Sequence, residues 1–511
     1  MKFKKIIISS LSFITFNLLP LMMTSCNVSN SESYSSNESF SSVSESDDSE
    51  IIYYTEGLEF TLSSDSKSYL LTGIGTATDE KIIIPSTFND KPVTIIEQNA
   101  FKNCFNIKSV IFPKSIISIE DQAFFGCVSL KDVTFSNSII DIGNYAFTGC
   151  VSLENISIPN SVISIGEYAF HLCHSLTSIV IPDSVTSIGE GLFKECTLLA
   201  NITIGNGITN ISNDTFTKCD SLKNVIIGNG VNSIGEETFK ECDSLTRITL
   251  GNNVKRIEKN AFFGCDSLKK INLPNSLEYI GMEAFKKSAL QSIIIPDSVT
   301  DIESCAFMEC SFLTDVKLGN GLSKISNSLF TACTSLKNVE IGNNVKIIGD
   351  SAFSNCKKLI NIVIPNSVTG IENNVFSHCI SLVNIEIPDS VKSIGGFSFV
   401  ECISLENVRI GNNIIDIGAG SFSGCSSLKN IIIPDSIKNI NPYTFSGCSS
   451  LTTITISNNV TNIGLKAFYL CNNLSNINYK GTIEQWNNID IKAEGNDNLL
   501  NATINYNYEE K

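Results

Sequence analysis

Cysteine is the residue type in this sequence with the most potential for chemistry. The chain has 511 residues and 18 cysteines, but only three histidines and one tryptophan. Thiols can form disulfides, bind zinc or act as nucleophiles, and their spacing helps to decide among these uses. Sixteen of them each follow a phenylalanine by three residues: Cys104, Cys127, Cys150, Cys173, Cys196, Cys219, Cys242, Cys265, Cys310, Cys333, Cys356, Cys379, Cys402, Cys425, Cys448 and Cys471.

This spacing argues against metal binding and nucleophilic catalysis. The sequence has no C-x-x-C pair, and thiols at one position of a repeat point the same way, so they cannot surround a tetrahedral metal ion. His171 and His174 lie beside Cys173, and His378 precedes Cys379, but we expect these histidines on the surface of a turn. No acid–base pair, phosphate loop or Ser/His/Asp set stands out. We therefore expect no metal, no cofactor and no enzymatic activity.

A column of buried thiols explains the series best. A free thiol packs as a small hydrophobic group and is often buried. The cysteines of neighbouring repeats would point their Cβ atoms in parallel. A disulfide instead needs a twisted geometry with Cβ atoms about 3.8 Å apart. Disulfides remain the alternative, because the compartment is expected to be oxidising. The series has a gap at Ser288, and Cys305 lies outside it, as an exposed thiol or a local variation in packing.

The elements that position these thiols are repeats marked by phenylalanine. Phe recurs every 23 residues from Phe101 to Phe285, steps by 22 to Phe307, and recurs every 23 again to Phe468, which gives seventeen marks. Units of this size cannot enclose a core alone and must stack in register. The length alone would suggest about three domains, but the period predicts one solenoid with a continuous core.

Each repeat contains two extended pieces and one compact turn. In Ile156-Ser157-Ile158 the apolar residues alternate as in a strand, and the following Pro159 ends it. A second short extended piece, Val162 to Gly166, comes next, and its glycine permits a sharp corner. The stretch around Ala-Phe-x-x-Cys predicts a single helical or 3₁₀ turn with its phenylalanine inside.

The repeat resembles the BspA-like, or Treponema pallidum-type, leucine-rich repeats. The match is to Cys-x-x-Leu-x-x-Ile-x-Ile-Pro-x-Ser-Val-x-x-Ile-Gly-x-x-Ala-Phe, as in Cys150 to Phe170, and it covers about residues 95–480. The resemblance implies a β-rich leucine-rich repeat solenoid with capped ends. Residues 51–98 resemble the N-terminal cap, residues 99–478 the repeats, and residues 479–511 the C-terminal cap, in which Trp486 would plug the core.

The first fifty residues indicate export and anchoring. A basic start and an apolar run lead to Met23-Thr24-Ser25-Cys26, which resembles a bacterial lipobox. We expect residues 1–25 to be a lipoprotein signal peptide and Cys26 to carry the lipid. The Ser-rich, acidic residues 26–50 predict a disordered tether between the lipid and the folded body. The expected location is the extracellular face of a bacterial cell.

Two columns of residues should point away from the core and form the ligand face. One, ten residues after each Phe, comprises Ile111, Thr134, Ser157, Val180, Thr203, Ile226, Thr249, Asn272, Ile294 in the shortened repeat, Lys317, Glu340, Val363, Glu386, Arg409, Ile432 and Thr455. The other, eight residues after Phe, is rich in asparagine: Asn155, Asn201, Asn224, Asn338, Asn361, Asn384, Asn407 and Asn430. The candidate ligand residues are Lys317, Glu340, Glu386, Arg409, Asn338, Asn361, Asn384 and Asn407, with a purely structural asparagine ladder as the alternative.

Charge and family resemblance narrow the partners. The net charge of −16 argues against nucleic acid and against an anionic membrane surface, so the membrane is contacted through the N-terminal lipid alone. The resemblance implies an adhesin that binds extracellular protein or glycan on host matrix, host cells or other bacteria. The alternative is a structural envelope or spacer protein without a specific ligand.

Overall fold

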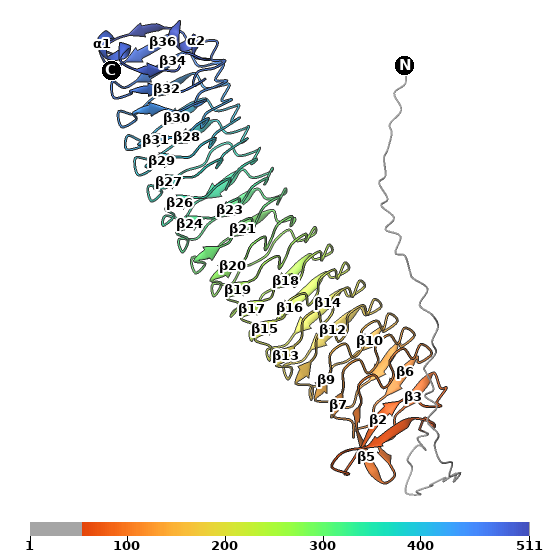
Figure 1. The fold of residues 1–511 in the computed structure, drawn as a ribbon. Helices are drawn as coiled ribbons and strands as arrows, with labels where there is room; N and C mark the ends of the chain where they lie inside the picture. Colours follow the sequence, from red (N-terminus) through yellow and green to blue (C-terminus); the bar gives the residue numbers. More distant parts are fainter. Residues whose placement is uncertain (1–53, 510–511) are drawn as a thin grey trace, which may run out of the picture. The chain divides into compact units, whose positions relative to one another are not determined.

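The computed structural model describes residues 54–509, and these form a solenoid of short parallel strands (Figure 1). The predicted leucine-rich repeat solenoid is therefore confirmed. Each repeat makes one coil with a turn-rich third side, and most coils have two strands. The coils that contain Asn272 and Val363 lack the first strand. The predicted signal peptide, the lipidated Cys26 and the tether at 26–50 lie outside the described residues.

The first strand of each coil stacks into a ladder, which we call the outer ladder. Its strands are β3 (Lys81–Ile83), β6 (Ser109–Ile111), β8 (Asp132–Thr134), β10 (Asn155–Ile156), β12 (Ser178–Ile181), β14 (Asn201–Ile204), β16 (Asn224–Ile227), β18 (Arg247–Thr249), β21 (Ser292–Ile294), β23 (Asp315–Lys317), β25 (Asn338–Glu340), β28 (Asn384–Glu386), β30 (Asn407–Arg409), β32 (Asn430–Ile432), β34 (Thr453–Ile456), β36 (Asn476–Tyr479) and β38 (Thr503–Asn505). Wherever these strands pair, they pair in parallel and in register, as Thr203 with Ile226 and Lys317 with Glu340.

The second extended piece forms a ladder of very short strands, the inner ladder. After β5 (Lys91–Ile96) it comprises β7 (Ser118–Ile119), β9 (Asp141–Ile142), β11 (Ser164–Ile165), β13 (Ser187–Ile188), β15 (Asn210–Ile211), β17 (Ser233–Ile234), β19 (Arg256–Ile257), β20 (Tyr279–Ile280), β22 (Asp301–Ile302), β24 (Lys324–Ile325), β26 (Ile347–Ile348), β27 (Gly370–Ile371), β29 (Ser393–Ile394), β31 (Asp416–Ile417), β33 (Asn439–Ile440), β35 (Asn462–Ile463) and β37 (Asp490–Ile491).

The third side of the coil differs from the predicted helical or 3₁₀ turn. It is a series of reverse turns in which Gln122 and Gly126, on either side of Phe124, have φ of 56° and 72°. A left-handed residue in the third position is typical of type II turns. The amides of Gln122, Phe124 and Gly126 donate to carbonyls of the next coil at 2.7–2.8 Å. In this arrangement alternate backbone amides bond carbonyls of the next coil, as they do in strands. A helical turn would use those amides for bonds within its own coil.

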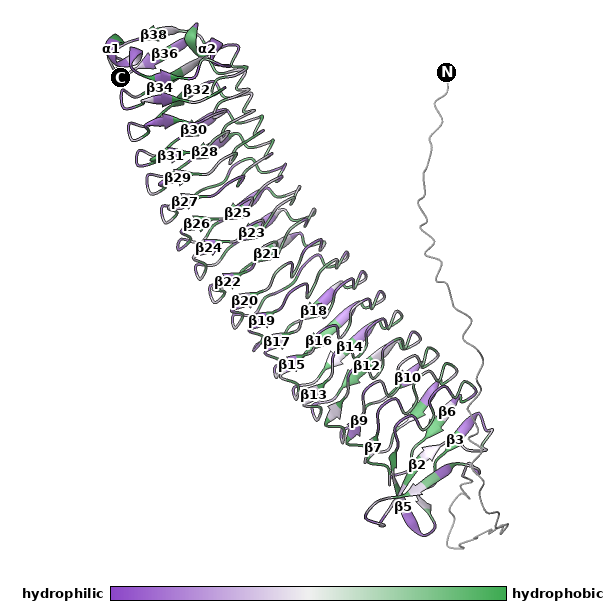
Figure 2. Ribbon diagram, in the orientation of Figure 1, coloured by the Kyte–Doolittle hydropathy of each residue, from purple (hydrophilic) through white to green (hydrophobic). Residues whose placement is uncertain are grey.

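The core is built from columns of identical side chains. Successive phenylalanine rings from Phe101 to Phe468 stack with centroids 4.9–5.7 Å apart and planes within 21° of parallel. All seventeen are fully buried, beside the leucine, isoleucine and cysteine columns. Figure 2 shows hydrophobic and hydrophilic segments alternating along each coil, as expected where inward and outward residues alternate. Stacking like residues gives every coil the same complementary neighbour on both sides.

The shortened repeat is absorbed without disturbing this core. Phe285 and Phe307 stack at 5.2 Å with planes 1° apart, so the missing residue does not break the ring column. The loss falls between the cysteine position, here Ser288, and Leu290. Ser288 is buried and its Oγ lies 3.4 Å from the Sγ of Cys310.

The N-terminal end is closed by a hairpin. Strands β1 (Glu59–Leu62) and β2 (Tyr69–Gly73) pair antiparallel, β2 continues in parallel to β5, and β4 (Thr87–Phe88) pairs antiparallel with β5. Gly75 has φ of 54°, and a Cβ there would lie 2.1 Å from the carbonyl oxygen of Gly57. Only glycine permits this approach between the two ends of the hairpin.

The C-terminal end is closed by two short helices, α1 (Ile483–Asn487) and α2 (Asp497–Leu500). Trp486 of α1 is buried against Tyr479, with ring centroids 5.1 Å apart. The fully buried Asn496 accepts a hydrogen bond from the amide of Phe468 at 3.0 Å through Oδ1. In earlier coils the phenylalanine amide bonds a carbonyl of the next coil, so this side chain replaces the missing coil.

Candidate ligand-binding face

The outer ladder presents the two predicted columns on one surface. In strands such as β25, side chains alternate between the core and solvent, so Asn338 and Glu340 point outward while Val339 packs against the core. The eight candidate residues are all exposed: Lys317, Glu340, Glu386, Arg409, Asn338, Asn361, Asn384 and Asn407. The structure thus brings the candidates together as two adjacent rows, and their binding role stays a prediction.

The four charged candidates form two ion pairs between neighbouring strands. The Nζ of Lys317 lies 3.0 Å from Glu340 Oε2, and Arg409 Nη1 lies 2.7 Å from Glu386 Oε1. The second nitrogen of Arg409 lies 3.9 Å from Asp389. All these side chains are about half exposed or more, so each pair contributes little to stability. The cluster is therefore neutral, with each charge next to its opposite.

The asparagine row bonds along itself. Asn407 donates to Asn384 at 2.7 Å, Asn384 donates to Asn361 at 3.3 Å, and Asn338 donates to Asp315 at 2.6 Å. The same ladder joins Asn224 to Asn201 at 2.8 Å. These contacts favour the structural interpretation of the row, because each amide is used to join one coil to the next.

Exposed aliphatic side chains also lie in the outward column, although none is among the eight candidate ligand residues. Val363, Ile294, Ile226 and Ile432 have 78%, 66%, 52% and 45% of their surface exposed. From Ile226 to Ile432 they recur on every third coil of one column, which at about 4.8 Å per strand is an interval of about 14 Å. Val180, 60% exposed, lies in the same column two coils before Ile226 and stands outside this spacing. The signal was present in the sequence, since all four stand at the same position of the repeat.

The predicted outward column has one exception near its C-terminal end. Thr455 is only 6% exposed, so its assignment to the accessible face is wrong. It lies in β34 between Ile432 and Asn478 of the neighbouring strands. The accessible column therefore ends at Ile432.

The cysteine column is buried, as predicted, and each thiol has a defined partner. From Cys127 to Cys471 every column thiol donates to the carbonyl oxygen of the phenylalanine in the preceding coil, at 3.0–3.4 Å. Burial raises the pKa of Cys196, Cys379 and Cys471 to about 12. A thiol that keeps its proton is a poor nucleophile and a poor metal ligand.

The residues that invited a metal or a nucleophile interpretation are dispersed. His378 is exposed, whereas His171 and His174 are half-buried, and burial lowers the pKa of His171. Cys305 is half-buried in a left-handed corner with φ of 62°, and burial raises the pKa of its thiol. Within residues 54–509, no group of three or more His, Cys, Asp or Glu side chains could hold a metal ion.

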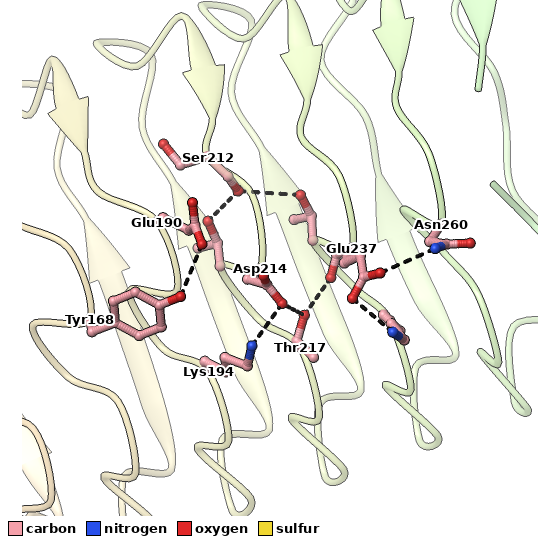
Figure 3. Close-up of polar contacts among 11 residues, drawn as sticks. Tyr168, Glu190, Lys194, Ser212, Asp214, Thr217, Glu237 and Asn260 are labelled. Carbon is pink, nitrogen blue, oxygen red and sulfur yellow. Dashed lines mark hydrogen bonds and ion pairs between the residues drawn. The ribbon is translucent and has the colours of Figure 1, made fainter. Parts of the chain in front are cut away.

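A polar network on the turn side was not predicted from the sequence (Figure 3). Tyr168 donates to Glu190 at 2.9 Å, and burial together with that carboxylate raises the pKa of Tyr168 to about 12. Lys194 lies 3.0 Å from Asp214, which also accepts from Thr217 at 2.9 Å. The next carboxylate, Glu237, pairs with Lys240 at 2.8 Å and accepts from Asn260 at 3.1 Å. Each carboxylate faces a donor, so the network joins coils and offers no unpaired acid or base.

Comparison with known proteins agrees with this architecture. A family model described as the BspA type leucine-rich repeat region, with six copies, matches residues 94–219, 164–291, 255–383 and 369–489. These matches together span most of the chain. No curated protein matches the chain.

Several solved structures are similar to the chain. A leucine-rich repeat protein from Bacteroides ovatus is 29% identical over 75% of this chain and 95% of its own, with a TM-score of 0.60. A leucine-rich cell surface protein from Faecalibacterium prausnitzii is 29% identical over 87% of this chain and 99% of its own, with a TM-score of 0.32. The leucine-rich repeat protein of T. pallidum is 30% identical over 37% of this chain and 89% of its own, with a TM-score of 0.36.

Proposed function

Since the chain belongs to the BspA-type leucine-rich repeat family, we propose that it is a bacterial surface protein that binds ligands through its outer ladder. Leucine-rich repeat solenoids generally serve as binding or scaffold folds. Among residues 54–509, no helix is long and apolar enough to cross a membrane. Anchoring is assigned to a diacylglyceryl group on Cys26, after removal of residues 1–25 and with residues 26–50 as the tether.

The observation that carries this proposal is the exposed aliphatic column. Val363 is 78% exposed between the two ion pairs, although an apolar side chain gains nothing from contact with water. The column therefore offers apolar contact to a ligand beside charged and amide groups, the combination found in protein interfaces. The ligand class is extracellular protein or glycan, and the proposed role is adhesion to host matrix, host cells or other bacteria.

A structural envelope or spacer protein is the second candidate function. The ion pairs and the asparagine ladder favour it, because they use the predicted ligand groups to join one coil to the next. The two candidates differ in one respect that can be measured. An adhesin has a saturable ligand, whereas a spacer has none.

Binding of residues 27–511 to arrays of matrix proteins, mucins and glycans tests the proposal. We expect saturable binding to at least one ligand, and loss of most of that binding when Lys317, Glu340, Glu386 and Arg409 are replaced by alanine. The matched control replaces Lys131 and Glu154, an exposed pair 3.7 Å apart outside the candidate set, and should bind normally. Absence of saturable binding to every array would favour the spacer function.

A further inference from the structure

We propose that the outer ladder binds a second copy of this chain, with the two solenoids antiparallel and their outward columns face to face. The evidence is the order of side chains from Ile226 to Ile432. Along the stack this order is Ile226, Thr249, Asn272, Ile294, Lys317, Glu340, Val363, Glu386, Arg409 and Ile432.

The spacing of the aliphatic residues favours a partner with the same rise per coil. They recur every third coil, and a ligand that contacts all of them must repeat at the same interval of about 14 Å. A second solenoid of the same kind has this repeat by construction. Two sheets can pack face to face at about 10 Å with their strands aligned. Such packing would cover side chains that are now 45–78% exposed.

A twofold axis between the strands of Lys317 and Glu340 makes the column complementary to itself. A twofold axis that runs along the strand direction reverses the stack, so coils at equal distances from the axis meet. Lys317 then faces Glu340 of the second copy, and Ile294 faces its Val363. Further out, Ile226 faces Ile432 of the second copy, Asn272 faces its Glu386, and Thr249 faces its Arg409. Apolar residues meet apolar residues, and no like charges are opposed in this column.

Other arrangements lack this complementarity. If the two stacks ran parallel, each residue would meet its own copy, so Lys317 would face Lys317 and Glu340 would face Glu340. If the axis passed through Val363, Glu340 would face Glu386 and Lys317 would face Arg409. Like charges opposed at an interface are unfavourable. The order of charges therefore excludes these two arrangements. Other antiparallel registers, such as one with its axis through Ile294, also oppose no like charges. Only the axis between Lys317 and Glu340 pairs all four aliphatic residues with one another and also sets opposite charges face to face.

Antiparallel pairing has a consequence for the cell surface, and this step rests on the proposed function. The first described coils of the two copies lie at opposite ends of the complex. If each chain is anchored at Cys26, the two anchored ends lie at opposite ends of the complex. Two copies on different membranes can therefore pair more readily than two copies on the same membrane. The ligand of such an adhesin would include the same protein on another cell.

Complementary substitutions test the register. Residues 27–511, which omit the lipid, should sediment as a dimer at concentrations approaching about 100 µM. Ile294→Asp places a carboxylate opposite Val363, and Val363→Lys places an ammonium opposite Ile294, so each variant alone should sediment as a monomer. An equimolar mixture should recover the dimer, because the new aspartate and lysine then face each other.

Ile415→Asp changes an aliphatic that is 68% exposed on the inner-ladder side, and it should leave the dimer intact. A wild-type chain that stays monomeric, or variants that do not form a dimer when mixed, would overturn the proposal. Cells displaying either variant should aggregate only when the two are mixed. If the purified variants complement each other while mixed cells stay dispersed, the dimer stands and the surface function fails.

Discussion

The thiol of Cys242 donates a hydrogen bond to the backbone carbonyl oxygen of Phe216, in the preceding coil, at 3.1 Å. That carbonyl also accepts the amide of Cys219 at 3.1 Å. The cysteine column thus combines the volume of a small hydrophobic residue with a donor for a buried carbonyl. This combination explains why cysteine occupies the position in sixteen coils.

Replacement of Cys242 by alanine should destabilise the solenoid by about 1–3 kcal/mol, because it leaves a void and removes a buried donor. Cys242→Ser keeps a hydroxyl donor at the position and should cost less. Urea unfolding followed by circular dichroism measures both variants. Equal losses for alanine and serine would show that packing alone explains the column.

Alkaline pH should destabilise the fold steeply. Burial raises the pKa of column thiols such as Cys196 and Cys379 to about 12, from an ordinary value of 9.0. The folded chain therefore keeps protons that the unfolded chain releases, and stability that is complete below pH 9 is lost as pH rises toward 12. Each such thiol contributes a slope of about 1.4 kcal/mol per pH unit.

The midpoint of urea unfolding from pH 7 to pH 11 measures this effect. It should be nearly flat below pH 8.5 and fall above pH 9. As a control, serine at Cys173, Cys196, Cys219 and Cys242 should reduce the alkaline slope by about 30%, since these are four of the thirteen column thiols whose pKa burial raises. A slope that is unchanged in this variant would assign the alkaline transition to other groups.

Gly75→Ala should open the N-terminal hairpin. The substitution adds a Cβ in left-handed backbone and places it 2.1 Å from the carbonyl oxygen of Gly57, so we expect a loss of about 3 kcal/mol. Gly149→Ala is the matched control, because φ there is 74° but the nearest atom lies 3.7 Å away, and it should cost only about 1 kcal/mol. Proteolysis of β1 and β2 reports the difference, and equal susceptibility of the two variants would contradict it.

Removal of the Arg409 side chain should separate binding from stability. The pair with Glu386 is exposed, so Arg409→Ala should change the free energy of unfolding by less than about 1 kcal/mol. Binding of any array ligand should nevertheless weaken by tenfold or more if the pair lies at the centre of the contact. Arg247→Ala, in the neighbouring column, provides a comparison. Unchanged affinity after Arg409→Ala would place the ligand elsewhere on the solenoid.

Cys26→Ser should release the protein from the membrane. Serine cannot form the thioether to diacylglycerol, so the chain should move to the soluble fraction and lose the mass of the lipid. Mass spectrometry of the N-terminal peptide and fractionation of cells measure both results. A membrane-bound Cys26→Ser chain would show that another segment provides the anchor.

Most of the fold could be predicted from the 23-residue repeat, but the backbone geometry of the turn side could not. A phenylalanine every 23 residues shows which residues align, and the stacking of Phe124 on Phe147 at 5.0 Å follows from it. The left-handed backbone of Tyr168 and Glu237 does not follow, because side chains of this size disfavour positive φ. Hydrogen bonds between coils override that local preference. Because these bonds depend on residues one coil away, the local sequence does not predict them.

The candidate face was predicted in position but not in its internal contacts. Lys317 and Glu340 stand 23 residues apart, so their alignment on neighbouring strands was expected. Their 3.0 Å pairing depends on side-chain conformation, which the sequence pattern does not specify. The burial of Thr455 depends in turn on how the chain folds beyond the last repeat.

The repeat between Phe285 and Phe307, which is one residue shorter than the others, indicates which changes of length the solenoid tolerates. One codon has been lost at the corner between Ser288 and Leu290, while the ring column continues undisturbed at 5.2 Å. That corner therefore tolerates the loss of a single residue, whereas the same loss within a strand would turn the later side chains of that strand to the opposite face. Duplication or loss of a whole coil would leave the core intact but shift the aliphatic residues out of their three-coil phase. If the outer ladder binds a second copy as proposed, chains that differ by one coil within this stretch would keep the same fold and no longer pair with each other.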